Sequence, residues 1–205
     1  MESILTVNTP AASLDLTVLA TVKLKFGITG TDEDVKISQW IKEASDFIAN
    51  YCHRVFGKEN VTELFRPECY MEYFVLKRIP IVSVTEVIED GTTLAAANYE
   101  IDSDVGAIYR LDDNDVRISW LPKKITIKYD AGYVLMGELP YDIEAACIEL
   151  IKEARSAATR EPLAKRIEIP DVETVDYWVG GIGESTFGLP AQVKATLDLY
   201  RIANV

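Results

Sequence analysis

The spacing of apolar residues changes twice along this chain, from helical to strand-like and back again. In residues 32–52 the apolar side chains recur at steps of four and three, which is typical of one buried helix face: Ile37, Ile41, Ala44, Ile48 and Tyr51. From residue 64 to residue 133, β-branched and aromatic residues come in short runs that Gly, Pro, Asp and Asn interrupt. Helical spacing returns after Pro140. Helices on both sides of a strand-rich insert indicate an α+β protein.

Four helices are predicted. Their approximate ranges are Thr17–Phe26, Asp32–Cys52, Pro140–Ala158 and a short helix from Pro190 through Val193, Leu197 and Tyr200. Gly27 is expected to end the first helix, because glycine readily adopts the left-handed conformation that follows many helices. Thr31 and Asp34 have the three-residue spacing of a capping box, so we expect their side chains to bond backbone N–H groups at the start of the second helix.

Six short strands are predicted in the middle of the chain: Tyr70–Leu76, Ser83–Glu89, Tyr99–Asp102, Ala107–Leu111, Val116–Trp120 and Lys124–Tyr129. Turns are expected at Asp90–Gly91 and at Asp112–Asn114. Short connections without helices between them favour a mostly antiparallel small sheet or sandwich. In residues 162–188 an alternating pattern is interrupted by Pro170, which favours an edge strand or an extended arm.

The chain is therefore expected to have four segments. Residues 1–63 would hold a loose N-terminal arm, over residues 1–13, and helices one and two, while residues 64–134 would form the β-rich insert. Residues 135–160 would supply the third bundle helix, and residues 161–205 an extended C-terminal arm that ends in a short helix.

The composition narrows the function classes. Of the 205 residues 48% are hydrophobic, enough to form a core without disulfides or metal ions. Lys and Arg number 21 against 33 Asp and Glu, a net charge of -12, which disfavours sequence-specific DNA binding. No pattern of a signal peptide or a membrane span is recognisable, and we expect a cytosolic location. Cys52, Cys69 and Cys147 are odd in number and widely spaced, which suits reduced thiols in a core.

The residues that could carry catalysis or bind a metal do not form a known motif. His53 is the chain's one histidine, and its place just after a predicted helix favours a helix-capping or surface role over that of a catalytic base. Cys52, His53 and Cys69 would offer zinc three ligands without a C-x-x-C pair. The glycines of residues 180–183 lack the spacing of a dinucleotide-binding loop. We therefore predict no enzymatic activity, no metal and no cofactor.

Acidic residues gather in the predicted strand region. Nine lie between Glu86 and Asp115, where Arg110 is the one cation. Calcium could bind three of them, but the ligand spacing of an EF-hand loop is missing, so an acidic turn is favoured. Such a face is usually just solvated; the sharper hypothesis is a surface that repels polyanions or meets a basic partner. The candidate acidic surface consists of Asp102, Asp104, Asp112, Asp113 and Asp115.

The C-terminal segment carries aromatic side chains but is too rich in glycine to form a core of its own. These side chains either dock on the chain's own helices or anchor it to a neighbouring subunit or another protein. The candidate partner-binding residues are Tyr177, Trp178, Phe187, Leu197 and Tyr200.

The order of several short motifs carries a resemblance to a known family. The motifs are Thr31–Asp34 with the helical stripe that follows, Arg78-Ile79-Pro80-Ile81-Val82-Ser83-Val84 leading to Gly91 and Tyr99, Gly106-Ala107-Ile108, Tyr129-Asp130-Ala131-Gly132-Tyr133 and Leu139-Pro140-Tyr141-Asp142-Ile143. Together they span roughly residues 16–160. Their order along the chain resembles that of the phage head-tail connector (adaptor, head-completion) family, which is also found in gene transfer agents.

The resemblance implies a non-enzymatic structural protein of the virion, built on an antiparallel helix bundle. Family members form a ring, typically dodecameric, beneath the portal, with a tail-side connector or stopper protein below, and provide the platform for tail attachment around the DNA channel. The C-terminal segment would contact the portal, and this chain departs from the smallest members by its β-rich insert and long C-terminal arm. Acidic residues in the channel would let DNA pass without adhering.

Three further expectations follow. In a closed ring, one face of each subunit must fit a different face of the next. We expect helices two and three to form this seam. Deletion of residues 165–205 would leave a folded core that no longer docks on the portal. The alternative to a connector is a monomeric acidic binding module that recognises a basic protein partner; a small hydrolase with a carboxylate site is the third hypothesis.

Overall fold

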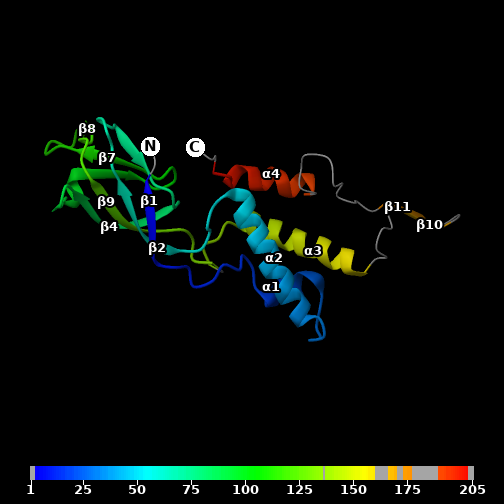
Figure 1. Ribbon diagram of the computed structural model, residues 1–205. Helices are drawn as coiled ribbons and strands as arrows, with labels where there is room; N and C mark the ends of the chain where they lie inside the picture. The colour runs from blue at the N-terminus through cyan, green and yellow to red at the C-terminus, as the bar shows by residue number, and fades with distance from the viewer. Residues whose placement is uncertain (1–2, 136, 160–165, 170–172, 177–188, 203–205) are drawn as a thin grey trace. The chain divides into compact units, whose positions relative to one another are not determined.

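The computed structural model describes residues 3–135, 137–159, 166–169, 173–176 and 189–202. The chain divides into two compact units (Figure 1). Residues 1–14 and 55–138 form the β unit, and residues 15–54 and 139–205 form the helical unit. Each unit therefore combines segments that lie far apart in the sequence.

The β unit contains two antiparallel sheets. The five-stranded sheet has the order β1 (Ile4–Thr9), β2 (Glu59–Phe65), β9 (Ile125–Ala131), β4 (Ile81–Glu89) and β5 (Thr92–Thr93). In the four-stranded sheet β7 (Ala107–Leu111) pairs with β3 (Tyr73–Val75), β6 (Tyr99–Asp102) and β8 (Arg117–Ile118), and a short 3-10 turn, η1 (Ala96–Asn98), precedes β6. The prediction of antiparallel sheets is confirmed. Turns lie at Asp90–Gly91, as predicted, and at residues 112–115, one residue longer than the predicted turn Asp112–Asn114.

Both sheets contribute to one apolar core. Val61 and Ile127 from the first sheet and Phe74 and Ile108 from the second are at most 2% exposed and belong to the same cluster as Trp120. Phe74 lies between Phe65 and the Trp120 ring, with ring centroids 4.6 Å and 5.4 Å away. A core shared by two sheets is the arrangement of a sandwich.

The expectation of a loose N-terminal arm is wrong. Residues 4–9 form strand β1, which pairs antiparallel with β2 from Ile4 opposite Leu64 to Thr9 opposite Asn60. β1 is an edge strand whose side chains are almost all exposed, so the sequence has no alternation there to reveal it.

Strand β2 was not predicted either, because two buried residues in its alternating pattern are acidic. Glu63 is fully buried and accepts hydrogen bonds from the Tyr129 hydroxyl (2.8 Å), the Lys77 N–H (3.1 Å) and the Ser3 hydroxyl. Glu59, 7% exposed, forms an ion pair with Arg78 at 2.9 Å. Burial of a carboxylate is tolerated where several donors satisfy it, but the sequence pattern then lacks the apolar residue expected at that position.

The helical unit contains α1 (Leu19–Phe26), α2 (Asp34–Cys52), α3 (Tyr141–Thr159) and α4 (Ala191–Tyr200), close to the predicted ranges. The predicted apolar faces are buried: Ile37, Ile41 and Ile48 in α2, Ile143, Cys147 and Ile151 in α3. α2 contacts the other three helices, and α3 contacts α4 (Figure 1).

The predicted capping box does not form. Glu33 is the N-cap of α2 and makes no side-chain cap bond, and the Thr31 carbonyl accepts the Asp34 N–H at 3.1 Å. The Asp34 carboxylate instead pairs with Lys23 of α1 at 2.6 Å. An ion pair between two helices thus replaces the local cap.

The end of the chain differs from a single extended arm. Strands β10 (Arg166–Ile169) and β11 (Glu173–Asp176) pair as an antiparallel two-stranded sheet, while Pro170 lies outside the described residues. α4 belongs to the core of the helical unit, since Leu197 is fully buried and the Ile202 N–H donates to the Cys52 carbonyl at 3.0 Å. This packing contradicts the expectation that residues 165–205 can be deleted without loss of the folded core.

Candidate interaction surfaces

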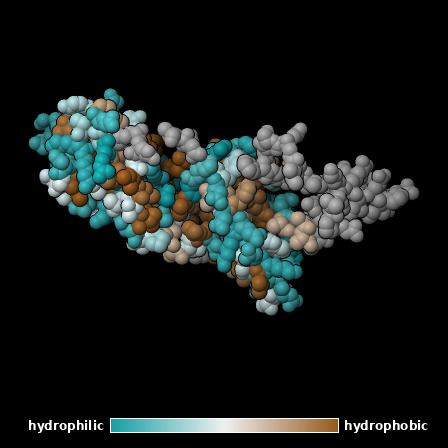
Figure 2. Space-filling model, in the orientation of Figure 1, coloured by the Kyte–Doolittle hydropathy of each residue, from teal (hydrophilic) through white to brown (hydrophobic). Residues whose placement is uncertain are grey.

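The acidic turn between β7 and β8 lines a hollow of about 850 Å³ on the β unit. The end of the unit that carries these strands is mostly hydrophilic in the space-filling view (Figure 2). Three of the five predicted acidic residues, Asp112, Asp113 and Asp115, lie in the lining of the hollow together with Glu100 and Arg117. Of the other two, Asp102 is the last residue of β6 and Asp104 lies in the turn that follows. The structure thus brings together part of the predicted acidic surface.

Two of these carboxylates hold their own turns. The Asp112 carboxylate accepts the Val116 and Asn114 N–H groups, both at 2.9 Å, and these hydrogen bonds hold the pKa of Asp112 below its ordinary value. Asp102 accepts the Val105 N–H at 3.2 Å in the turn before β7. Asp102, Asp104, Asp113 and Asp115 are exposed and Asp112 is half-buried, so the first four supply most of the negative surface of the two turns.

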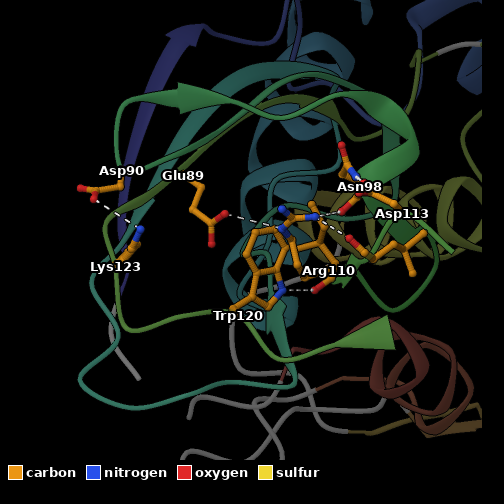
Figure 3. Close-up of polar contacts among 9 residues, drawn as sticks. Glu89, Asp90, Asn98, Arg110, Asp113, Trp120 and Lys123 are labelled. Atoms are coloured by element: carbon orange, nitrogen blue, oxygen red, sulfur yellow. Dashed lines mark hydrogen bonds and ion pairs between the residues drawn. The ribbon is translucent and has the colours of Figure 1, made fainter. Parts of the chain in front are cut away.

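Several carboxylates of the acidic window between Glu86 and Asp115 form ion pairs, one with Arg110 of the window and the others with cations from outside it. The ion pairs are Glu86–Lys128 (3.8 Å), Glu89–Arg110 (3.6 Å), Asp90–Lys123 (3.7 Å) and Glu100–Arg117 (2.7 Å). Figure 3 shows Arg110 between Glu89 and Asn98, whose carbonyl accepts from Arg110 at 2.9 Å. Lys123, Lys128 and Arg117 come from later in the sequence, so the charge excess of the window is larger in sequence than in the fold.

An aromatic face that the sequence analysis did not single out lies next to the acidic turns. Tyr73 of β3 is opposite Tyr109 of β7, with ring centroids 5.6 Å apart. The Arg117 guanidinium lies 3.8 Å from the centre of the Tyr109 ring and pairs with Glu100, whose pKa it lowers chiefly by hydrogen bonding. Only the register of four separate strands brings these residues together, and periodicity within one segment does not encode that register.

The predicted partner-binding residues fall into two groups. Tyr177, Trp178 and Phe187 lie outside the described residues. Leu197 is fully buried in the helical unit, where it packs as a core residue, so its assignment to a partner surface is wrong. The Tyr200 hydroxyl donates to the Asp142 carboxylate at 2.9 Å.

The structure shows where the residues weighed for catalysis or metal binding lie. His53 is exposed, adopts the left-handed conformation at φ 53°, and caps α2 through its backbone N–H rather than through its ring. Burial raises the pKa of the Cys52 thiol to about 11 and that of Cys147 to about 12, which keeps both protonated. Cys69 is exposed rather than a core thiol. Among the described residues, no group of three His, Cys, Asp or Glu side chains could hold a metal ion.

Comparison with known proteins identifies a family that this chain matches. A family model described as head completion protein matches residues 15–153. No curated protein sequence matches the chain. Within the described parts of the chain, every helix is too short or too polar to cross a membrane.

Several solved structures share the fold. The neck of the native gene transfer agent particle, computed with C12 symmetry, contains a chain with a TM-score of 0.59 at 15% identity. The neck of the empty particle, computed with C6 symmetry, gives 0.57 at 16%, and the virion of the native particle gives 0.58 at 14%. Each similarity covers 98% of this chain and 97% of the other. Because the family model spans well over half of the sequence, the chain belongs to the head completion protein family.

Proposed function

We propose that this chain is a structural head-tail connector of a phage-like virion, forming a ring beneath the portal on which the tail attaches. The observation that carries the proposal is the family match over residues 15–153, together with a fold shared over nearly the whole chain with neck structures of gene transfer agent particles. One of those necks was computed with C12 symmetry, which supports a ring of twelve copies. The partners in this role are the portal protein on one side and a tail-side connector or stopper protein on the other.

The helices are proposed to form the antiparallel bundle of such a connector. Glu33 at the start of α2 pairs with Arg155 near the end of α3 at 2.8 Å, and Ser45 contacts Cys147 at 3.9 Å farther along both helices. These contacts support opposite directions for α2 and α3. A closed ring of such subunits needs a heterologous interface, in which one face of each subunit fits a different face of the next.

The acidic surface suits a channel for DNA. Asp104, Asp113 and Asp115 are exposed, and like charge repels a passing phosphate backbone. We place these carboxylates toward the lumen of the ring, where they would prevent adhesion without any specific contact with DNA.

The C-terminal arm is proposed to reach the portal. The β10–β11 pair is a two-stranded sheet, and such a hairpin is marginally stable alone in water. Addition of one of its strands to a sheet of the portal would stabilise both partners through backbone hydrogen bonds. Tyr177, Trp178 and Phe187 remain the proposed aromatic anchors of this arm.

A second candidate function rests on the hollow beside β8. Its lining of Tyr99, Glu100, Asp112, Asp113 and Asp115 would suit a basic protein segment, as in a monomeric acidic binding module. The two functions differ in what happens to the particle when the chain is missing.

The test is reconstitution of particles that lack this chain. DNA-filled heads from a producer strain with the gene deleted are mixed with purified chain and separately purified tails, and tailed particles are counted by electron microscopy. A connector restores tail attachment and appears as a ring at the neck. Heads that acquire tails equally well without the added chain would contradict the proposed function.

A further inference from the structure

The helix α4, drawn in red in Figure 1, depends on its neighbours for its helical form. It is ten residues long, whereas an isolated helix in water needs about 12–15 residues even with a favourable sequence. Pro190, the residue before it, makes no side-chain cap bond, and its first turn contains no acidic residue to stabilise the helix N-terminus. Contacts with α2 and α3 therefore hold α4 in place.

These contacts are less extensive than those that join α2 to α3. Two of the ten side chains of α4 are buried, those of Val193 and Leu197. α2 and α3 are 19 residues long, each has a buried apolar face, and the ion pair of Glu33 with Arg155 at 2.8 Å joins them as well. Because the free energy of burial grows with apolar area, α4 should separate from the unit more readily than α2 separates from α3.

One aromatic residue of α2 holds the end of α4. The Tyr51 hydroxyl donates to the Asp198 carboxylate at 2.6 Å, and this hydrogen bond is the chief cause of the raised pKa of Tyr51. The Arg201 guanidinium, directly after α4, lies 5.4 Å from the centre of the Tyr51 ring. A hydrogen bond to a charged group and a cation–π contact thus meet at one side chain. We call Tyr51, Asp198 and Arg201 the latch.

The residue after Tyr51 lies beneath α4. Cys52 is fully buried, its thiol donates to the Leu197 carbonyl at 3.6 Å, and its own carbonyl accepts the Ile202 N–H at 3.0 Å. Cys147 is also fully buried, but it contacts Ser45 between α3 and α2. Departure of α4 alone would therefore expose Cys52 and leave Cys147 covered by α2.

We propose that α4 is a strap, held closed by the latch at Tyr51, that opens while α1, α2 and α3 remain folded. The open form is a minor population, in keeping with the place of α4 in the core of the closed unit. Opening would leave residues 160–190, which connect α3 to α4, attached through α3 alone. Fully extended, these residues span about 100 Å at about 3.3 Å per residue, so the open strap can reach far beyond its own unit. The strap does not depend on the proposed connector function.

The two buried thiols test the strap in one experiment. In a Cys69→Ser background, the folded chain is treated with a thiol reagent at pH 8, and peptide mass spectrometry follows labelling at Cys52 and Cys147 separately. Each rate is divided by the rate in denaturant, which gives the fraction of time that the thiol is accessible. We expect Cys52 to be accessible at least about tenfold more often than Cys147, although both react far more slowly than an exposed thiol.

Urea separates opening of the strap from unfolding of the whole unit. Urea favours each opening in proportion to the surface that the opening exposes. At low urea, labelling at Cys52 should therefore change little, whereas labelling at Cys147 should rise steeply. Equal rates and equal urea dependence at both thiols would overturn the strap, since Cys52 would then become accessible only when the unit unfolds.

Two substitutions of Tyr51 test the latch. Tyr51→Phe removes the hydrogen bond to Asp198 and keeps the ring beside Arg201, while Tyr51→Ala removes both contacts. We expect labelling at Cys52 to rise roughly three- to tenfold in Tyr51→Phe and further in Tyr51→Ala. Labelling at Cys147 should rise by similar factors, because unfolding of the unit breaks the same contacts. If Tyr51→Ala does not fold, Tyr51→Phe and the urea series still decide.

Two control variants complete the test. Glu33→Gln breaks the ion pair with Arg155, which is lost only when α2 and α3 separate, so it should raise labelling at Cys147 about two- to fivefold and leave Cys52 unchanged. Tyr141→Phe should change neither rate, since the Tyr141 side chain is 87% exposed. A rate at Cys52 that no Tyr51 variant changes would overturn the latch. Equal increases at both thiols in Glu33→Gln would mean that α2 and α3 separate whenever α4 does, which overturns the strap.

Discussion

At the scale of single residues, Gly132 explains why one motif of the family resemblance has its sequence. Its φ of +101° is in the region that favours glycine, and a Cβ there would lie 2.4 Å from the Gly57 carbonyl oxygen. Its N–H donates to the Pro80 carbonyl at 2.9 Å, while the Tyr133 N–H donates to the Phe56 carbonyl at 2.8 Å. Gly132 therefore allows three segments of the β unit to meet backbone to backbone.

We expect Gly132→Ala to lower the free energy of unfolding by more than about 2 kcal/mol, because it adds backbone strain to a clash with a main-chain atom that cannot move away alone. Gly30→Ala is the matched control, since its Cβ would meet nothing within 4 Å and its φ is not positive. Urea unfolding of the two variants measures the difference. Equal stability of both would refute this account of Gly132.

The cysteines give a second prediction at this scale. Cys52 and Cys147 are buried, with pKa values raised by burial to about 11 and about 12, whereas Cys69 is exposed. Because the thiolate is the reactive form, only one thiol per native chain should react with a disulfide reagent at pH 8, and all three after unfolding in denaturant. Replacement of Cys69 by Ser should abolish the native reaction. Rapid labelling of a second thiol in the folded chain would contradict the burial of the other two.

At the scale of secondary-structure elements, the sequence predicted helices better than strands for a physical reason. The stripes of α2 and α3 repeat over 19 residues each, so one buried face leaves a clear pattern. Tyr99–Asp102 and Ala107–Leu111 were predicted with their observed bounds, because a turn flanks each strand. β1 was missed since pairing with β2, rather than burial, holds it, and β2 was missed since hydrogen bonds to Glu59 and Glu63 replace apolar contacts.

The hairpin of β10 and β11 provides a test that leaves the core intact. Replacing residues 166–176 by a flexible linker of equal length removes both strands but keeps α4, whose Val193 and Leu197 are buried in the helical unit. We expect thermal unfolding to be unchanged and binding to purified portal rings to fall at least about tenfold, since the strands would no longer add to a portal sheet.

Leu197→Ala is the complementary variant. It should lower stability by about 2–5 kcal/mol, because it empties a fully buried site, yet leave portal binding of the folded fraction unaffected. Portal binding that survives hairpin replacement would exclude β10 and β11 from the contact.

At the scale of the whole molecule, the negative charge that makes up the net charge of -12 is distributed differently in the fold than along the sequence. Counting charges between residues 86 and 115 gave an acidic block, but ion pairs across neighbouring strands cancel part of it, as between Glu100 and Arg117. What remains is concentrated in the two turns that flank β7. The sequence predicted the sign of this surface, while the fold determines where it lies.

If the two acidic turns face the lumen of the ring, their charge should determine how fast DNA is released. Asp104 and Asp113 are exposed, and neither accepts the hydrogen bonds that hold the Asp102 and Asp112 turns, so both can change without loss of fold. In particles reconstituted with the chain, DNA release should be fastest with Asp at both positions, slower with Asp104→Asn and Asp113→Asn, and slowest with Asp104→Lys and Asp113→Lys, because each added cation attracts phosphates. The slowing by lysine should weaken as salt rises, since released counterions then favour the complex less. Release rates are measured by dye uptake of the emerging DNA. Equal rates for all three forms at low salt would mean that these turns face away from the channel. The ring itself could still assemble as proposed.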